Sequence, residues 1–190
     1  VFESEEDFSF QKKLAFAHFR AGNYEKAIEL SLHNLETSPH DLYTINIYRV
    51  LGLAYLKQGK HEKAIETFKK RVSFAESSEE IDLFYTQLAY LDVADAYRRK
   101  GDAEEAINWY QRYIFNQSKE KSYLEARKAY KIKSGKEYSK AVHDLAKLYF
   151  QVGRTEQGRL ACQVKLPDEE YARKLAELRK AHSETEENHV

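Results

Sequence analysis

The sequence predicts an all-α protein, an α-solenoid of antiparallel helix hairpins, on three observations. The phrase GNYEKAIE from Gly22 returns as GKHEKAIE from Gly59 and as GDAEEAIN from Gly101, at intervals of 37 and 42 residues. Repetition at such a period is typical of stacked arrays of small units. Leu, Ala, Glu, Lys and Tyr dominate and only 2 of 190 residues are proline, which indicates helix throughout. Apolar residues also follow helical spacing.

The first helix of each predicted hairpin precedes its glycine. Apolar or small residues fall there at helical spacing, which predicts an amphipathic helix; they are Leu14, Ala15 and His18, then Leu51, Gly52 and Tyr55, then Val93, Ala94 and Tyr97. The glycine is expected to end this helix in a left-handed conformation. Asn23 and Asp102 follow at once and can cap the next helix.

The second helix of each hairpin begins its apolar stripe at the repeated Ala-Ile pair. Small residues are expected where the two helices cross, because they let the backbones approach; the predicted pairs are Ala15 with Ala27, Gly52 with Ala64, and Ala94 with Ala106. Aromatic side chains at helical spacing are interpreted as core between successive pairs, namely Tyr48, Tyr55, Phe68, Tyr90, Tyr97 and Tyr110.

On these residues the chain resembles a tetratricopeptide repeat protein, with repeats at about 8–41, 45–78 and 87–120. The first repeat departs from the family pattern at Ser31 and Asn34, where apolar residues are usual, so its second helix is expected to pack less well. The spacing exceeds the family's period of about 34 residues. We expect the extra residues to lengthen helices, with residues 76–80 forming a turn.

The region after Tyr113 breaks the period and allows two divisions into helices. In one, residues 119–133 form an extra helix and a fourth first helix follows, marked by Leu145, Ala146, Tyr149 and Gly153. In the other, residues 119–133 are the first helix, Gly135 is the turn and Tyr138 begins the second helix. The second division is favoured, because helices joined by short turns alternate in direction.

The favoured division predicts a single domain over residues 1–182. Degenerate hairpins then occupy about 119–152 and 155–182, and the last helix is a charged cap with a polar outer face. Residues 183–190 are expected to form a disordered acidic tail.

The sequence contains no motif for catalysis, for a metal or for a cofactor. We therefore predict that the protein is not an enzyme and binds no metal and no cofactor. No two of the seven histidines have the i, i+4 spacing of a zinc-binding helix. The glycines fall at predicted turns rather than in a phosphate-binding loop. The single cysteine, Cys162, is interpreted as a small core residue.

The charge of the chain limits the classes of partner that it is expected to bind. The 31 basic and 31 acidic residues cancel, so no global field selects nucleic acid or a membrane surface. One basic cluster, residues 119–136, is interpreted as a solvated helix face, which makes nucleic acid a less favoured partner.

No apolar run reaches the roughly 20 residues of a membrane-spanning helix. The chain begins at Val1 and lacks methionine, which indicates a fragment or mature segment; a cytoplasmic location is slightly favoured and an exported or periplasmic one stays open.

The resemblance implies a ligand groove lined by the first helix of each repeat. The groove residues carried over to this sequence are Ser9, Lys12, Phe16, Phe19, Arg20, Asn46, Arg49, Leu53, Leu56, Lys57, Leu88, Leu91, Asp95, Arg98 and Arg99. Six are basic and one is acidic, a net charge of +5. The stretch 45–56 is apolar nearly all round, so either the groove binds something hydrophobic or an intramolecular helix fills it.

These properties predict a non-enzymatic scaffold for protein–protein interaction, whose groove binds an acidic peptide or helix with apolar anchors. The alternatives are a peptide-sensing regulatory domain of a larger protein and a nucleic-acid-binding helical repeat that uses residues 119–136. Self-association is compatible with the apolar ends of an open array.

A clamp for the C-terminal carboxylate of chaperones is not expected. Family members that bind such tails use Lys, Asn and Arg side chains at set positions. The matching residues here are Lys12, Phe16, Val50, Leu88 and Asp92, of which Lys12 alone agrees. Phe16 and Asp92 would oppose a terminal carboxylate.

Overall fold

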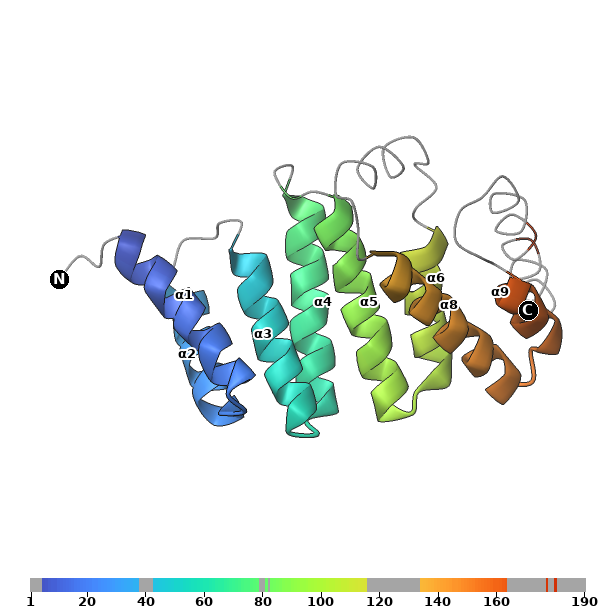
Figure 1. The fold of residues 1–190 in the computed structure, drawn as a ribbon, viewed down its shortest axis with the longest axis horizontal. Coiled ribbons are helices and arrows are strands. Elements are labelled where there is room, and N and C mark those ends of the chain that lie inside the picture. Colours follow the sequence, from blue (N-terminus) through green and yellow to red (C-terminus); the bar gives the residue numbers. More distant parts are fainter. Residues whose placement is uncertain are drawn as a thin grey trace. The chain divides into compact units, whose positions relative to one another are not determined.

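The structure is a computed structural model that describes residues 5–37, 43–78, 81, 83–115, 134–163, 177 and 180. In these residues eight α-helices occur and no strand, which confirms the predicted all-α class. They are α1 (Glu5–Arg20), α2 (Tyr24–Thr37), α3 (Thr44–Lys57), α4 (His61–Ser77), α5 (Leu83–Lys100), α6 (Ala103–Phe115), α8 (Ser134–Gln151) and α9 (Thr155–Gln163) (Figure 1).

The chain divides into two compact units. The first, Val1–Lys100, contains α1 to α5, and the second, Gly101–Val190, contains α6, α8 and α9. In the first unit each helix packs on the next in the chain, and α3 also contacts α1 and α5 (Figure 1). The first helices of the three predicted repeats, α1, α3 and α5, are therefore neighbours.

The turns after the first helices take the predicted left-handed glycine conformation. The φ angles of Gly22, Gly59 and Gly101 are 82°, 71° and 91°. At the first turn, Gly22 N–H donates to Phe19 O at 3.1 Å and Asn23 N–H donates to His18 O at 2.9 Å. This pair of bonds is the Schellman motif, which satisfies carbonyls that a helix end leaves unpaired.

The residues that follow the glycines differ in capping. Asp102 Oδ1 accepts from Glu105 N–H at 3.3 Å, so the predicted cap of α6 is confirmed. The Asn23 amide lies 3.4 Å from Nδ1 of His18.

The apolar character of α3 follows from its position among four helices. It buries residues on more than one side, namely Thr44, Ile45, Ile47, Val50, Leu51, Gly52 and Ala54. The backbone of α3 comes close to α4 at Gly52, where a Cβ atom would lie 2.3 Å from Phe68 Cε1. Phe68, one turn after the fully buried Ala64, occupies the space that glycine leaves. The aromatic stripe is core at Phe68, Tyr90, Tyr97 and Tyr110, as predicted, whereas Tyr48 and Tyr55 are half-buried.

In the 42-residue interval from Gly59 to Gly101 the extra residues lengthen helices, as predicted. The helices α4 and α5 have 17 and 18 residues, against 14 in α2 and α3. Because α4 continues through Ser77, the turn predicted at 76–80 begins later. Ser78 is the first extended residue, with φ −104° and ψ 120°.

The favoured division of the C-terminal third is wrong at Gly135, because this residue lies inside α8. Within the described residues, 145–153 have the features that the other division assigns to a first helix, and its extra helix at 119–133 lies outside them. Gly153 has a φ of 78° and joins α8 to α9, and the two helices pack on each other. Leu145, Ala146 and Tyr149 are buried, as in a first helix.

The spacing of α8 and α9 explains this outcome. Each hairpin has a small residue in its first helix, a glycine at the turn and a small residue in its second helix. The spacing of these three positions is the same in Ala146, Gly153 and Gly158 as in Ala15, Gly22 and Ala27. Gly158 is buried and is the small residue of the second helix in this pattern, a position that alanine occupies in the three repeats predicted from the sequence. Residues 119–133, the predicted helix 168–182 and the predicted tail 183–190 lie outside the described residues, apart from Glu177 and Lys180.

The core of the second unit combines apolar contacts with polar pairs. Ile107, Ile114, Leu145 and Tyr149 are fully buried. Gln111 Nε2 on α6 donates to Tyr149 OH on α8 at 2.6 Å. At the surface of this unit, an ion pair of 3.0 Å joins Arg154 to the exposed Glu104. These bonds connect α6 to the hairpin of α8 and α9.

The second helix of repeat one buries the two polar side chains that depart from the family pattern. Ser31 and Asn34 are 0% and 1% exposed. Neither the Ser31 hydroxyl nor the Asn34 amide has a hydrogen-bond partner where the structure is described. A buried polar group without a partner costs about 1–3 kcal/mol.

Replacing Ser31 with alanine is therefore expected to stabilise the protein by about 1 kcal/mol, since it removes an unpaired hydroxyl and changes little volume. Urea unfolding followed by circular dichroism measures this. Ser73→Ala is the control, because Ser73 is exposed on α4 and tests helix propensity alone. A Ser31→Ala variant no more stable than Ser73→Ala would contradict the prediction.

Candidate functional site

A pocket of about 330 Å³ lies between α1 and α3 in the first unit. Its walls are mostly apolar, and ten residues line it: Lys13, Ala15, Phe16, Phe19, Tyr43, Asn46, Ile47, Arg49, Val50 and Leu53. Phe16 and Tyr43 are 50% and 59% exposed, which is unusual for large aromatic side chains. Cavities used by ligands have this character, an apolar wall with a few polar groups.

Five of the predicted groove residues meet in this pocket. They are Phe16, Phe19, Asn46, Arg49 and Leu53. Arg20 lies beside it, with its guanidinium carbon 6.0 Å from the centre of the Phe16 ring. This distance suits a cation–π contact, which stabilises an exposed pair by about 0.5–1 kcal/mol.

The other predicted groove residues lie away from the pocket. Leu56 and Lys57 follow it along α3, and Leu88, Leu91, Asp95, Arg98 and Arg99 lie on α5. Lys57 and Arg99 are exposed, and the three leucines are half-buried. The side chains of Ser9 and Lys12 are outside the described set.

Five pocket residues were not predicted to line the groove; they are Lys13, Ala15, Tyr43, Ile47 and Val50. Lys13 follows Lys12 directly, so a shift of one residue around α1 would have found it. Tyr43 precedes α3, at the end of the connection from α2, and no helical spacing applies there.

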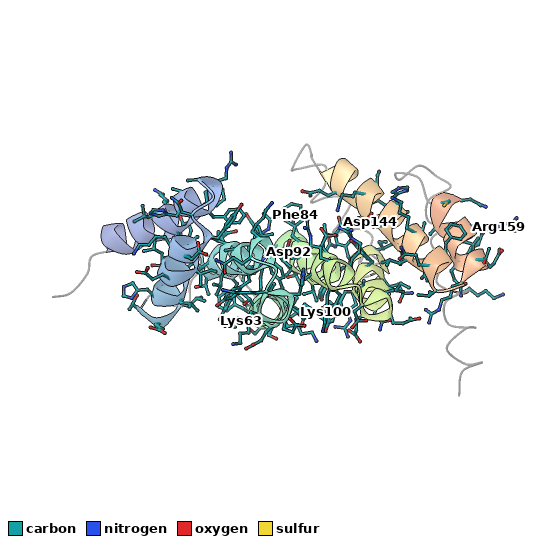
Figure 2. The ribbon with its side chains drawn as sticks, turned by 90° about the horizontal axis from the view of Figure 1, so that it is seen from below. Lys63, Phe84, Asp92, Lys100, Asp144 and Arg159 are labelled. Carbon is teal, nitrogen blue, oxygen red and sulfur yellow. The ribbon has the colours of Figure 1, made fainter. Side chains whose placement is uncertain are left out.

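An ion-pair cluster lies next to the pocket and joins α3, α4 and α5. Asp92 Oδ2 accepts from Arg49 Nε at 3.3 Å and from Arg71 Nη1. Arg71 Nε donates to the backbone oxygen of Ile45 at 3.0 Å. Figure 2 labels Asp92 on α5, which packs against both α3 and α4.

The electrostatics of this cluster reflect burial. The Arg71 side chain is 1% exposed and that of Asp92 is 11% exposed. Burial lowers the pKa of Arg71 to about 10, which leaves it a cation at neutral pH. Burial also raises the pKa of Asp92, while the guanidiniums of Arg71 and Arg49 oppose that rise.

The sequence contains a signal for Arg71. Arg71 occupies the apolar stripe of α4, three residues after Phe68 and one before Val72. An arginine on a buried stripe needs a counter-charge. The counter-charge is Asp92, 21 residues further along the chain.

The predicted positive field of the groove is partly compensated within the protein. Asp92 offsets one charge of the pair Arg49 and Arg71. Asp95 accepts from Arg98 Nη2 at 3.2 Å. The positive charge that remains on this face lies on side chains such as Arg20, Lys57 and Arg99.

No cluster of metal-binding residues is found among the described residues. In that same part of the chain, no helix is long and apolar enough to cross a membrane. The interpretation of Cys162 as a core residue is wrong, because the side chain is exposed. On α9 the buried stripe consists of Gln157, Gly158 and Ala161, and Cys162 falls one residue off it.

Comparison with known proteins gives a consistent fold. Models of the tetratricopeptide repeat match residues 8–77 and 81–123. No curated protein matches the chain by sequence.

Among solved structures, two of a Podosopora anserina protein named kinesin light chain, with nearly identical TPR-like repeats, are similar. They are 17% and 19% identical, cover 98% of this chain and 80% and 92% of their own, and give TM-scores of 0.63 and 0.61. BtubC (BKLC) from P. vanneervenii is 18% identical over 94% of this chain and 72% of its own, with a TM-score of 0.56. At these identities the likeness establishes the α-solenoid fold alone.

Proposed function

This chain belongs to the tetratricopeptide repeat family, whose members are scaffolds for protein–protein interaction, and on that premise we propose that the face of α1, α3 and α5 binds an acidic peptide or helix with apolar anchors. The observation that carries the proposal is the pocket between α1 and α3. There exposed aromatic and aliphatic walls meet the guanidinium of Arg49.

The apolar part of the ligand would enter the pocket. Phe16 and Tyr43 lose exposed area when another side chain covers them, and burial of apolar surface contributes about 25 cal/mol per Å². The acidic part is favoured by the cations around the pocket, namely Lys13, Arg20 and Arg49. Charges of this sign raise the association rate of an acidic partner.

A double substitution tests this function. The Arg49→Glu, Leu53→Asp variant is expected to bind at least about tenfold more weakly than the unchanged protein to a 12-residue peptide with two leucines flanked by glutamates. Binding by the unchanged protein should weaken between about 50 mM and 500 mM NaCl, because exposed charges are screened. Isothermal titration calorimetry measures both effects.

The control variant is Lys147→Glu, which changes an exposed charge on α8, outside the proposed site. It should bind as the unchanged protein does. Circular dichroism checks that the double variant remains folded. The proposal would be refuted if the affinity for the peptide did not change with salt concentration and were unchanged in the double variant.

A further inference from the structure

The guanidinium of Arg49 takes part in two features at once. Its Nε donates to Asp92 Oδ2, and the same side chain lines the pocket between α1 and α3. Arg49 donates no other hydrogen bond within the described part of the chain. Its terminal nitrogens, Nη1 and Nη2, can therefore donate to a ligand. Two parallel N–H donors of this kind bind a carboxylate with defined geometry.

Asp92 is in turn held from the other side. Arg71 Nη1 donates to the same Oδ2 atom, and Arg71 Nε donates to Ile45 O at the start of α3. Since Arg71 is buried, this chain of bonds connects α3, α4 and α5 beneath the surface that carries Arg49. Asp92 is a fixed support for a half-exposed arginine whose side chain is 43% exposed.

We propose that Asp92 positions Arg49 to bind a carboxylate next to the apolar side chain that enters the pocket, so that this subsite selects peptides with an acidic residue beside an apolar anchor. The inference rests on the function proposed above. Holding a flexible side chain in its binding geometry before the ligand arrives reduces the entropy lost on binding. Asp92 is a positioning residue, and Arg49 is the residue that would contact the ligand.

Charge alone would predict the opposite effect of removing Asp92. The cluster of two arginines and one aspartate carries a net charge of +1. Replacing Asp92 with asparagine raises that charge to +2 and would strengthen carboxylate binding by simple attraction. Positioning predicts weaker carboxylate binding instead. The sign of the change therefore separates the two explanations.

The experiment compares two peptides of equal shape, acetyl-Glu-Phe-Glu-amide and acetyl-Gln-Phe-Gln-amide, on the full chain. The unchanged protein should prefer the acidic peptide by about tenfold, measured by NMR titration. In Asp92→Asn the preference should fall to about twofold, although the amide oxygen can still accept from Arg71. Asp144→Asn is the matched control and should keep the preference, because Asp144 lies on α8, outside the proposed site, and pairs with Lys140.

A second variant keeps the test decisive if Asp92→Asn does not fold. Arg49→Lys preserves the charge but removes the fork of donors, so the preference should also fall to about twofold. In a double-mutant cycle, Asp92→Asn should change nothing further once Arg49 is lysine, because Asp92 acts through Arg49. An additional loss in that background would overturn the inference.

The two proposals fail differently. If the unchanged protein prefers the acidic peptide and either variant keeps that preference, the positioning role is refuted and the proposed function stands. If the unchanged protein binds neither peptide, the proposed function fails at this pocket, and the inference fails with it.

Discussion

Replacing Asp92 with alanine is expected to lower the free energy of unfolding by about 3–5 kcal/mol, the cost of leaving a buried charge without its partner. Arg71 has a side chain that is 1% exposed, and Asp92 is its only ion-pair partner in the described part of the chain. Its remaining hydrogen bond, to Ile45 O, is to a neutral group. Urea unfolding followed by circular dichroism measures the loss.

Two further variants identify the cause of that loss. In Arg71→Met combined with Asp92→Leu, most of the stability should return, because replacing a buried ion pair by apolar residues is often close to neutral. Arg49→Gln should cost less than about 1 kcal/mol, since the Arg49 pair is partly exposed. If Asp92→Ala lowered the free energy of unfolding by less than Arg49→Gln does, the unpaired buried charge of Arg71 would not be the cause.

Replacing Gly52 with alanine is expected to destabilise the protein by about 3 kcal/mol, at the upper end for overpacked cores. The new Cβ would lie 2.3 Å from Cε1 of Phe68, whose side chain is fully buried, so the ring cannot turn toward solvent. In an open helix the same change would stabilise by about 1 kcal/mol, because alanine forms helices better than glycine. Thermal or urea unfolding gives the sign directly.

Gly158→Ala is the matched control for this prediction. Its Cβ would meet the Phe150 ring at 2.8 Å, but Phe150 is 45% exposed and can turn toward solvent. The expected change is smaller than about 1 kcal/mol. Phe68→Leu should restore part of the stability of Gly52→Ala. Equal losses in Gly52→Ala and Gly158→Ala would show that the clash with Phe68 is not the cause.

The hairpins could be predicted because their determinants are local. Each hairpin is marked by a glycine in the left-handed region, the Schellman bonds around it and small residues at fixed distances before and after it. All of these lie within a single hairpin. In the C-terminal third the same local signals, Ala146 and Gly153, mark a helix and its turn, whereas the parity of helices pointed to a turn at Gly135, which lies inside α8. Gly158 completes the pattern, so the place where the two helices of a hairpin cross accommodates glycine as well as alanine.

The candidate site could be predicted only in part. The first-helix positions included Phe16, Asn46 and Arg49, because a helix exposes the same face along its length. That the pocket lies between α1 and α3, with Leu91 and Arg98 on α5 outside it, depends on the distances between helices. No residue spacing within one helix contains that information.

The sequence by itself determined the family, the all-α class and the positions of the turns, because hydrophobic period and glycine conformation act over a few neighbouring residues. The tertiary structure alone decided which charges on the first-helix face are compensated. Arg71 and Asp92 are 21 residues apart and on different helices, and Arg49 is 43 residues from Asp92. Their pairing follows from packing that brings three helices together, since a buried cation must find its counter-charge wherever the fold places one.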